Sequence, residues 1–307
     1  MTFHQGSQVN AQSVVVSAAG ISNQNFMAGR MVFDQAARPD ARIENRGAIT
    51  VKEAGLAALV APSVANSGVI TARMGHVVLA GAAAHTIDMY GDGLISIDVT
   101  RQVRQAPVGP DGKVVTALVT NTGTIAADGG TIVLTARAAD GVVQNLVRAG
   151  GSVHADTAGG QTGRIEITGT GGSVVIEGHV AAAGRVAGTM GGTVVVAGSR
   201  ATVVAPTARI SASGQAGGGT VALGTTLARA TGSGPAPAGT SARTLIATGA
   251  RVSADATRAG HGGRVTAGQL YGIRAIFGHT RHAQGRLVFP HHGPGCDHLR
   301  HHQPGAQ

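Results

Sequence analysis

Three aspartates, Asp88, Asp92 and Asp98, are the nearest that this sequence comes to a catalytic group of acids. Enzymes that cleave polysaccharides use two or three neighbouring carboxylates as general acid, base or nucleophile, or to hold calcium. Asp92, however, precedes Gly93 in a turn-like stretch, and Asp98 falls on the polar side of an alternating apolar pattern. We therefore expect solvated turn and strand residues here, and we predict no catalytic residues and no enzyme activity.

A second group able to do chemistry lies near the end of the chain, where the single cysteine, Cys296, is close to His298, His301 and His302. Thiolate and imidazole are zinc ligands, so a metal site is one interpretation. The alternative is an out-of-frame or degenerate terminus. Its support is that the repeat pattern stops after Thr266, and that His, Pro, Gly and Arg then occur without periodicity. We favour this alternative and predict no metal site and no cofactor.

Other motifs that carry chemistry are absent from the sequence. It contains no H-E-x-x-H, P-loop, G-x-S-x-G or glycine-rich calcium repeat. Four isolated histidines stand beside strand-like residues, and we expect each to be solvated or hydrogen-bonded rather than a ligand or base. They are His76, His85, His154 and His179.

The charge of the chain is basic, with a formal net charge of +9, but only 2% of the residues are aromatic. Arginines occur singly along the sequence instead of in clusters, and few aromatic side chains are present to stack on bases. We therefore predict that nucleic acid is not a partner, and that the arginines form a solvated face. The one uncharged stretch long enough to suggest a membrane span, residues 54–72, contains Pro62 and Asn66 and repeats a motif found elsewhere. We thus predict no transmembrane segment.

The strands and corners that must position these residues are predicted by a motif that occurs three times. The motif is an apolar residue, then Asn-x-Gly, then an apolar β-branched residue. Asn and Gly tolerate the left-handed backbone of a tight corner, whereas Val and Ile suit a pleated, half-buried strand. We predict equivalent corners in which the asparagines stack and satisfy backbone groups. These structural corners are Asn45, Gly47, Asn66, Gly68, Asn121 and Gly123.

Further along the chain a related unit consists of a glycine corner and a strand. Repetition every 20 to 30 residues or so is typical of a solenoid, in which each unit buries its apolar face on the next. We predict an all-β, right-handed parallel β-helix with short loop excursions and an irregular C-terminal tail, forming a rod on the order of 50 Å long. The glycines that open the units are Gly130, Gly163, Gly192, Gly219 and Gly263.

Several stretches are expected to leave or modify the coil. Residues 22–25 are polar and predict a corner, and residues 94–99 alternate as a strand. Residues 101–119 contain Asp111-Gly112 between apolar runs and predict a hairpin-like excursion. Residues 225–245, rich in Gly and Pro, predict an exposed loop or a longer coil. No signal peptide is visible, and the chain opens within the repeat, so we expect an uncapped first rung.

The chain resembles the secretion and haemagglutination-type domain of filamentous haemagglutinin-like exoproteins of bacterial two-partner secretion. The likeness covers residues 1–100 well and residues 101–266 in the looser manner of a repeat stalk. The segments that carry it are HQGSQVNAQSVVVSAAGISNQNFMAGRMVF, ARIENRGAITVKEAGLAALVAPSVANSGVITARMGHVVLAG and DMYGDGLISIDV.

The resemblance implies a right-handed parallel β-helix that crosses the outer membrane through a dedicated β-barrel transporter and becomes a secreted or surface-exposed adhesin. Its partners would be that transporter and host or bacterial surface receptors or glycans. The expected domains are the distal part of a secretion-type domain (1–100), a repeat stalk (101–266) and an irregular His-rich tail (267–307). The alternatives are a carbohydrate-active β-helix enzyme and a truncated reading frame without a function of its own.

Overall fold

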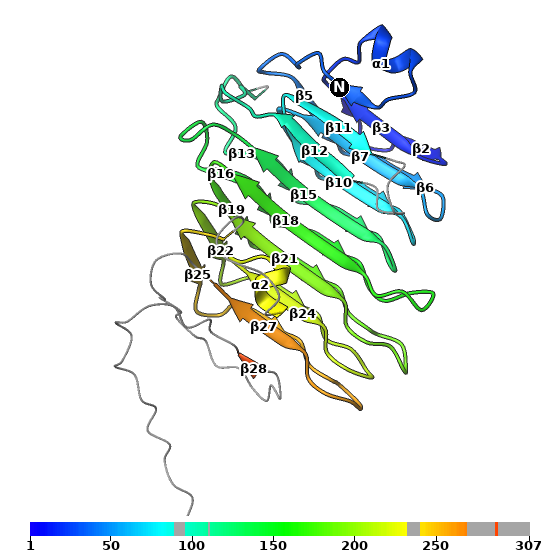
Figure 1. Ribbon diagram of the computed structural model, residues 1–307, viewed down its shortest axis with the longest axis vertical. Helices are drawn as coiled ribbons and strands as arrows, with labels where there is room; N and C mark the ends of the chain where they lie inside the picture. The colour runs from blue at the N-terminus through cyan, green and yellow to red at the C-terminus, as the bar shows by residue number, and fades with distance from the viewer. Residues whose placement is uncertain (89–95, 110, 232–239, 269–285, 288–307) are drawn as a thin grey trace, which may run out of the picture.

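A computed structural model of the chain describes residues 1–88, 96–109, 111–231, 240–268 and 286–287. Within these ranges the chain winds as a right-handed parallel β-helix, and each coil contributes one strand to each of three parallel sheets. The coils stack from the N-terminal end to the C-terminal end of the molecule (Figure 1). The predicted fold class is therefore confirmed; the tail that we expected to be irregular lies almost wholly outside the described residues.

We name the sheets A, B and C in the order in which each coil visits them. Sheet A consists of β1 (Thr2–Phe3), β5 (Arg42–Asn45), β8 (Ser63–Asn66), β13 (Ala117–Asn121), β16 (Asn145–Ala149), β19 (Ser173–Ile176), β22 (Ala201–Val204) and β25 (Arg243–Ile246). Sheet B consists of β2 (Gln8–Ala11), β6 (Ala48–Val51), β9 (Val69–Thr71), β14 (Thr124–Ala126), β17 (Ser152–His154), β20 (His179–Ala181), β23 (Arg209–Ser211) and β26 (Arg251–Ser253).

Sheet C forms the third side of the coil and is the longest of the three sheets. It consists of β3 (Val14–Ser17), β7 (Leu56–Ala61), β10 (His76–Gly81), β15 (Thr131–Arg137), β18 (Arg164–Thr170), β21 (Thr193–Gly198), β24 (Thr220–Leu223), β27 (Arg264–Ala267) and β28 (Arg286–Leu287).

The interior is filled by columns of aliphatic side chains, one residue from each coil. Ile49, Ile70 and Ile125 stack in sheet B, and Leu79 and Leu134 pair in sheet C, each at most 1% exposed. Alternate residues point inward because side chains alternate across a strand, which places the β-branched and leucine residues in a single interior. Burial of this apolar surface is the main favourable contribution to folding.

The glycine-and-strand units occupy one register of sheet C, as their repetition predicted. Thr131, Arg164, Thr193, Thr220 and Arg264, which follow the five glycines, are successive partners in the parallel ladder. The glycines are required by close approach of the coils.

A Cβ added to Gly192 would lie 2.1 Å from the carbonyl oxygen of Gly163, and one added to Gly219 would lie 1.9 Å from that of Gly192. No side chain fits at these corners.

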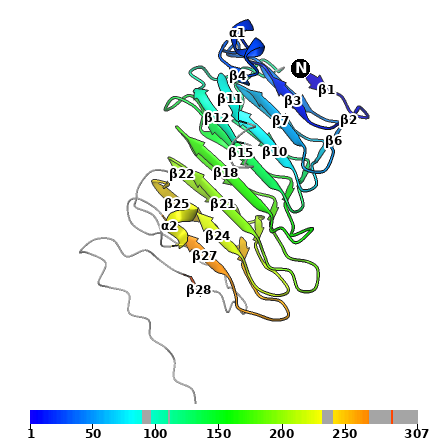
Figure 2. The same ribbon diagram turned by 45° about the vertical axis from the view of Figure 1, so that its right-hand side comes forward.

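The excursion between β10 and β13 forms a small antiparallel sheet together with a strand from the earlier segment before β5. We name it the first excursion, because it is the first of the two that the sequence predicted. The strands of this sheet are β4 (Val32–Phe33), β11 (Ala84–Asp88) and β12 (Ser96–Arg101), and they pack over the outer face of sheet C near the N-terminal end (Figure 2). The alternating strand that we expected at residues 94–99 therefore lies outside the coil, beginning at Ser96.

A smaller hairpin occurs inside the predicted 101–119 excursion. Val108 and Val114 form an antiparallel bridge, and the amide of Gly109 donates to the carbonyl of Lys113 at 2.7 Å. The Asp-Gly turn thus lies in a hairpin-like excursion, as its sequence predicted.

Two short helices correct the expectations for the remaining loops. The predicted polar corner at residues 22–25 is the start of helix α1 (Asn23–Met27), whose first turn is capped by the Ser22 hydroxyl accepting from the Asn25 amide. Within the predicted 225–245 loop, helix α2 (Leu227–Thr231) packs Leu227 and the buried Ala230 onto the outer face of sheet C (Figure 1). Apolar side chains at helical spacing give this segment a face to bury.

The excursions also shorten the rod. Each of sheets A and B has eight strands in the described part of the chain, which at about 4.8 Å per strand gives a stack about 34 Å long, less than the expected 50 Å. The stack is shorter because the residues of the excursions before β5, before β13 and before β25 add no further coil to it.

His85 lies beneath the small antiparallel sheet and differs from its predicted state. Its imidazole is inaccessible to solvent and stacks on Phe33, with ring centroids 4.5 Å apart, and neither ring nitrogen has a hydrogen-bond partner among the described residues. We expected a solvated or hydrogen-bonded histidine, but here aromatic stacking holds the ring. Because burial disfavours the charged form, the pKa of His85 falls to about 4.

A matched pair of substitutions at one corner tests the close approach of the coils. A Cβ on Gly151 would lie 2.1 Å from the carbonyl oxygen of Gly123, whereas one on the adjacent Gly150 would meet nothing closer than 3.4 Å. Gly151→Ala should lower the free energy of unfolding by about 1–3 kcal/mol, because an overpacked site must shift its backbone. Gly150→Ala should leave it unchanged or raise it by up to about 1 kcal/mol. Urea denaturation of both variants measures this, and equal losses would contradict the steric explanation.

Replacing His85 by Phe tests the buried imidazole. Since its pKa is lowered from 6.5 to about 4, the unfolded chain binds the proton more readily, and the stability present above pH 6.5 is lost as the pH falls toward 4. At about 1.36 kcal/mol per pKa unit, this loss is about 3 kcal/mol. His85→Phe keeps the stacking partner but not the titration. Urea melts at pH 7 and pH 4 should therefore show a smaller pH effect in the variant, and an identical pH effect would refute the assignment.

Candidate functional site

The three predicted asparagine corners lie side by side in sheet A and form a ladder of side-chain amides. Asn45, Asn66 and Asn121 are successive ladder partners of β5, β8 and β13, and each is at most 1% exposed. The amide nitrogen of Asn45 donates to the side-chain oxygen of Asn66 at 2.8 Å, and that of Asn66 donates to Asn121 at 2.7 Å. Residues far apart in the sequence thus share one buried hydrogen-bonded column.

Both ends of this ladder are satisfied by the corner glycines. The side-chain oxygen of Asn45 accepts from the Gly47 amide at 3.2 Å, and the side-chain nitrogen of Asn121 donates to the Gly123 carbonyl at 3.3 Å. A buried polar group without a partner costs about 1–3 kcal/mol, so a complete ladder avoids that cost at the ends as well as within. Beyond Asn121 the column continues with Ala149, which has no polar group to satisfy.

The corner glycines follow a different rule from the one that the sequence suggested. Gly47, Gly68 and Gly123 are absent from the positions with a left-handed backbone. A Cβ on Gly68 would instead lie 2.1 Å from the carbonyl oxygen of Gly47, and one on Gly123 would lie 2.1 Å from that of Gly68. The expectation of a left-handed corner was wrong here, because these glycines are needed for contact between coils.

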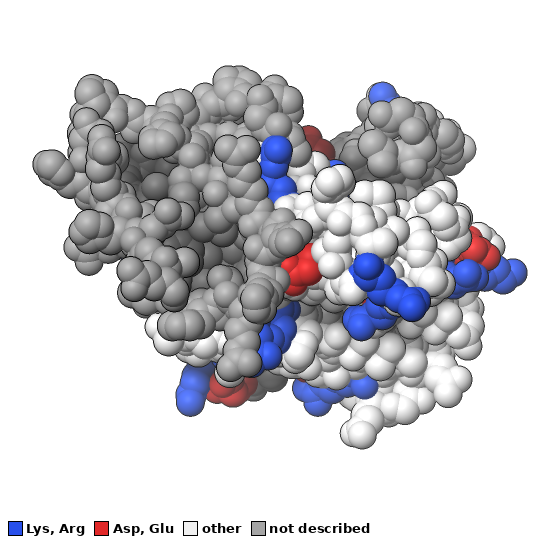
Figure 3. Space-filling model, turned by 90° about the horizontal axis from the view of Figure 1, so that it is seen from below, with Lys and Arg blue, Asp and Glu red and all other residues white. Residues whose placement is uncertain are grey.

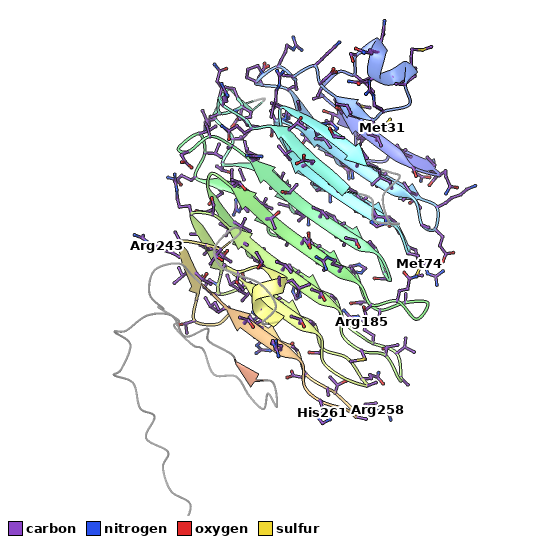
Figure 4. All side chains as sticks on the ribbon, in the orientation of Figure 1. Met31, Met74, Arg185, Arg243, Arg258 and His261 are labelled. Carbon is purple, nitrogen blue, oxygen red and sulfur yellow. The ribbon has the colours of Figure 1, made fainter. Side chains whose placement is uncertain are left out.

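A surface that sequence reasoning missed is built by the loops from sheet B to sheet C, which we name the B–C loops. They join Thr71 to His76 and Ala126 to Thr131 in the first coils but are longer from β17 onward. The long B–C loops are residues 155–163, 182–192, 212–219 and 254–263. Figure 4 shows Arg185, Arg258 and His261 along this edge of the molecule, opposite Arg243.

The long B–C loops are held to one another by backbone bridges. Gly184 bridges Gly214, Gly214 bridges Ala256, and Met190 bridges Gly217, so the stacking of the coil continues into the loops. Exposed apolar side chains stand on this ordered backbone, Val186 at 65% and Met190 at 53% exposed. Exposed apolar side chains on an ordered backbone are suited to contact with another surface. The sequence feature that could have predicted this surface is the longer stretch between each sheet B strand and the following sheet C strand from β17 onward.

The same edge brings together Asp128, His154 and Asp156, whose ligand atoms lie within 4.8 Å of one another. One oxygen of Asp128 already has two partners: it accepts from the Asp156 amide at 3.0 Å and lies 3.1 Å from the His154 Nδ1 atom. Asp156 accepts from the Ala183 amide at 2.9 Å and from the Arg185 side chain. The carboxylates therefore connect successive coils, which accounts for the cluster without an ion.

The other histidines and the acids considered for catalysis are not brought together in the described part of the chain. Burial lowers the pKa of His76, whereas His179 is exposed. Asp98 pairs with Thr86 in the antiparallel sheet, away from the coil, and Asp92 lies outside the described residues. The predicted alternative zinc ligands also lie outside them; they are Cys296, His298, His301 and His302.

Basic side chains on the face seen from the C-terminal end lie separately among neutral ones (Figure 3). Some arginines of the described chain are paired with acids, as in the ion pair of Arg148 with Glu177 at 2.8 Å. On this face the described basic side chains form no continuous track of the kind that contacts a nucleic-acid backbone.

Replacing the central amide tests the ladder. Asn66→Leu would leave the side-chain nitrogen of Asn45 and the side-chain oxygen of Asn121 unpaired, at about 1–3 kcal/mol each. We expect a markedly lower melting temperature by circular dichroism. Thr120→Val, on the outward-facing side of β13, is the control and should change stability by less than about 0.5 kcal/mol. An unchanged melt of Asn66→Leu would mean that the ladder contributes nothing to stability.

Comparison with solved structures gives an informative likeness, whereas comparison with sequences gives none. No family model and no curated protein sequence matches the chain. Among solved structures, the crystal structure of the HMW1 secretion domain from Haemophilus influenzae superposes with a TM-score of 0.66 and 22% identity, covering 94% of this chain and 77% of that one. No helix in the described residues is long and apolar enough to cross a membrane. At this level of identity the likeness supports the fold alone.

Proposed function

We propose that this protein is a non-catalytic, secreted or surface-exposed exoprotein, or a part of one, that attaches to cells or matrix in the manner of filamentous haemagglutinin-like adhesins. The observation that carries the proposal is the architecture, a continuous stack of coils that resembles a secretion domain over 94% of the chain. A partner that exports the chain, an outer-membrane transporter, belongs to the same proposal. Residues 1–100 would correspond to the distal part of a secretion-type domain and residues 101–266 to a repeat stalk.

The mechanism is presentation of surface loops by a rigid rod. Each coil is fixed by ladders on three sides, so residues on the loops are held at set spacings. The B–C loops, with exposed Val186 and Met190, are the contact surface that we favour, because exposed apolar side chains on an ordered backbone provide area to bury. The excursions at 101–118 and 225–245 are further contact surfaces, and Val114 in the first is 57% exposed.

A non-catalytic role is also consistent with the chemistry of the acids in the described chain. The carboxylates of Asp128 and Asp156 both accept backbone hydrogen bonds from the next coil. Carboxylates bonded in this way join successive coils, which is a structural rather than a catalytic role.

Adhesion of the purified protein tests this proposal. Beads coated with the full chain should adhere to epithelial or bacterial cells several-fold above albumin-coated beads. The double variant Val186→Ser and Met190→Ser should lose most of that binding, because exposed apolar area is removed. Val69→Ser, on the outer face of sheet B and 45% exposed, is the control with the same type of change and should bind as the wild type does.

Two results would contradict the proposal, and a third would move its contact surface. No adhesion above albumin on any cell type would remove the adhesive function. Cleavage of an acidic polysaccharide by the same preparation, detected as new reducing ends or unsaturated sugars, would favour the enzyme alternative. Loss of adhesion in Val108→Ser with Val114→Ser, but not in the B–C loop variant, would transfer the contact surface to the first excursion.

A further inference from the structure

A second site lies where the first excursion returns to the coil. A cavity of about 630 Å³ opens at the corner between sheets C and A, bordered by Ala36, Ala37 and Pro39, by residues 100–105 and by the end of β15. Three arginines, Arg101, Arg104 and Arg137, and two glutamines, Gln102 and Gln105, contribute to its lining, and none of the lining residues is acidic or aromatic. The volume is within the usual range for small-molecule sites, about 300–1,000 Å³.

The backbone beneath the cavity is a hydrogen-bonded platform. The amide of Ala37 donates to the carbonyl of Ala83 at 2.9 Å, and the amide of Ala83 donates to that of Arg101 at 3.0 Å. The amide of Val103 donates to the carbonyl of Arg137 at 2.8 Å, and Val103 itself is buried in the main core. Segments that are distant in the sequence are thereby locked together. The arginines start from fixed backbone positions, which reduces the entropy lost when a ligand is bound.

The guanidinium groups of this cavity have spare hydrogen-bonding capacity. Ion pairs in the described part of the chain involve other basic residues, and no described carboxylate lies within ion-pair distance of Arg101, Arg104 or Arg137. Arg137 makes one long hydrogen bond, from Nη1 to the carbonyl of Val99 at 3.5 Å. Three like charges around one concavity repel one another, and a bound anion would relieve that repulsion.

We propose that this cavity, which we name the arginine pocket, binds a ligand through an oxyanion: a phosphate, a sulfate or a carboxylate. Guanidinium presents planar pairs of donors that match two oxygens of such a group, and the glutamine amides supply neutral donors beside them. The lack of aromatic side chains means that the anion, rather than a stacked ring, would provide the affinity. Binding here does not depend on export or on adhesion through the B–C loops.

Titration calorimetry of the purified full chain in low salt tests the pocket. The probes are inorganic phosphate, inorganic sulfate and glucuronate. We expect saturable binding of at least one probe to a single site, weakening as salt is added. Arg101→Gln with Arg137→Gln should weaken it by roughly tenfold or more, because charge-assisted hydrogen bonds are lost. Arg258→Gln, an exposed arginine on the B–C loops, is the matched control and should bind as the wild type does.

The outcomes separate the sources of the anion and can overturn the proposal. Tightest binding of phosphate would indicate a phosphate ester, whereas tightest binding of sulfate or glucuronate would indicate an acidic sugar. If the double variant unfolds at a lower temperature by circular dichroism, Arg104→Gln takes its place, since its side chain is exposed. Absence of saturable binding with all three probes, or equal weakening in the pocket and Arg258 variants, would refute the arginine pocket whatever the adhesion experiment shows.

Discussion

Close packing of successive coils at their corners is the constraint on which the rest of this structure depends. Parallel strands in a ladder lie about 4.8 Å apart, and the chain must turn between sheets within that spacing. At the corner of Gly192 a Cβ would lie 2.1 Å from the carbonyl oxygen of the coil before it, so no larger residue fits. Corner glycines such as Gly68, Gly130 and Gly219 are therefore needed to let successive coils touch, and the ladders and the aliphatic interior depend on that contact.

This constraint explains which parts of the fold could be predicted from the sequence. Corner and strand recur in a fixed order, so the β-helix and the shared register of Asn45, Asn66 and Asn121 were accessible from residue types alone. The physical reason for glycine at these corners could not be predicted in the same way. Glycine is suited both to a left-handed backbone and to close approach of two coils, and its identity cannot distinguish them. The coordinates of the neighbouring coil are needed to make that distinction.

The excursions and the long B–C loops were harder to predict because they interrupt the repeat. Asn45 and Asn66 are 21 residues apart, but Asn66 and Asn121 are 55 apart, since the first excursion lies between them. Helix α2 is too short for its apolar residues to show a clear helical period. His85 was misjudged for a related reason: its burial depends on Phe33, a residue in another strand, and no local pattern records that contact.

The difference between residues of the coil and residues of the excursions indicates where a binding site is most easily accommodated in a solenoid. A residue of the coil has a neighbour above and below in its column, so its size and polarity are constrained twice, as the corner glycines and stacked isoleucines illustrate. A residue of an excursion has no such column. Unpaired arginines such as Arg101 and Arg104 can therefore be accommodated at the return of the first excursion without disturbing the stack. In this fold the coils provide stability and spacing, and residues that recognise a ligand or partner are expected where the chain departs from them.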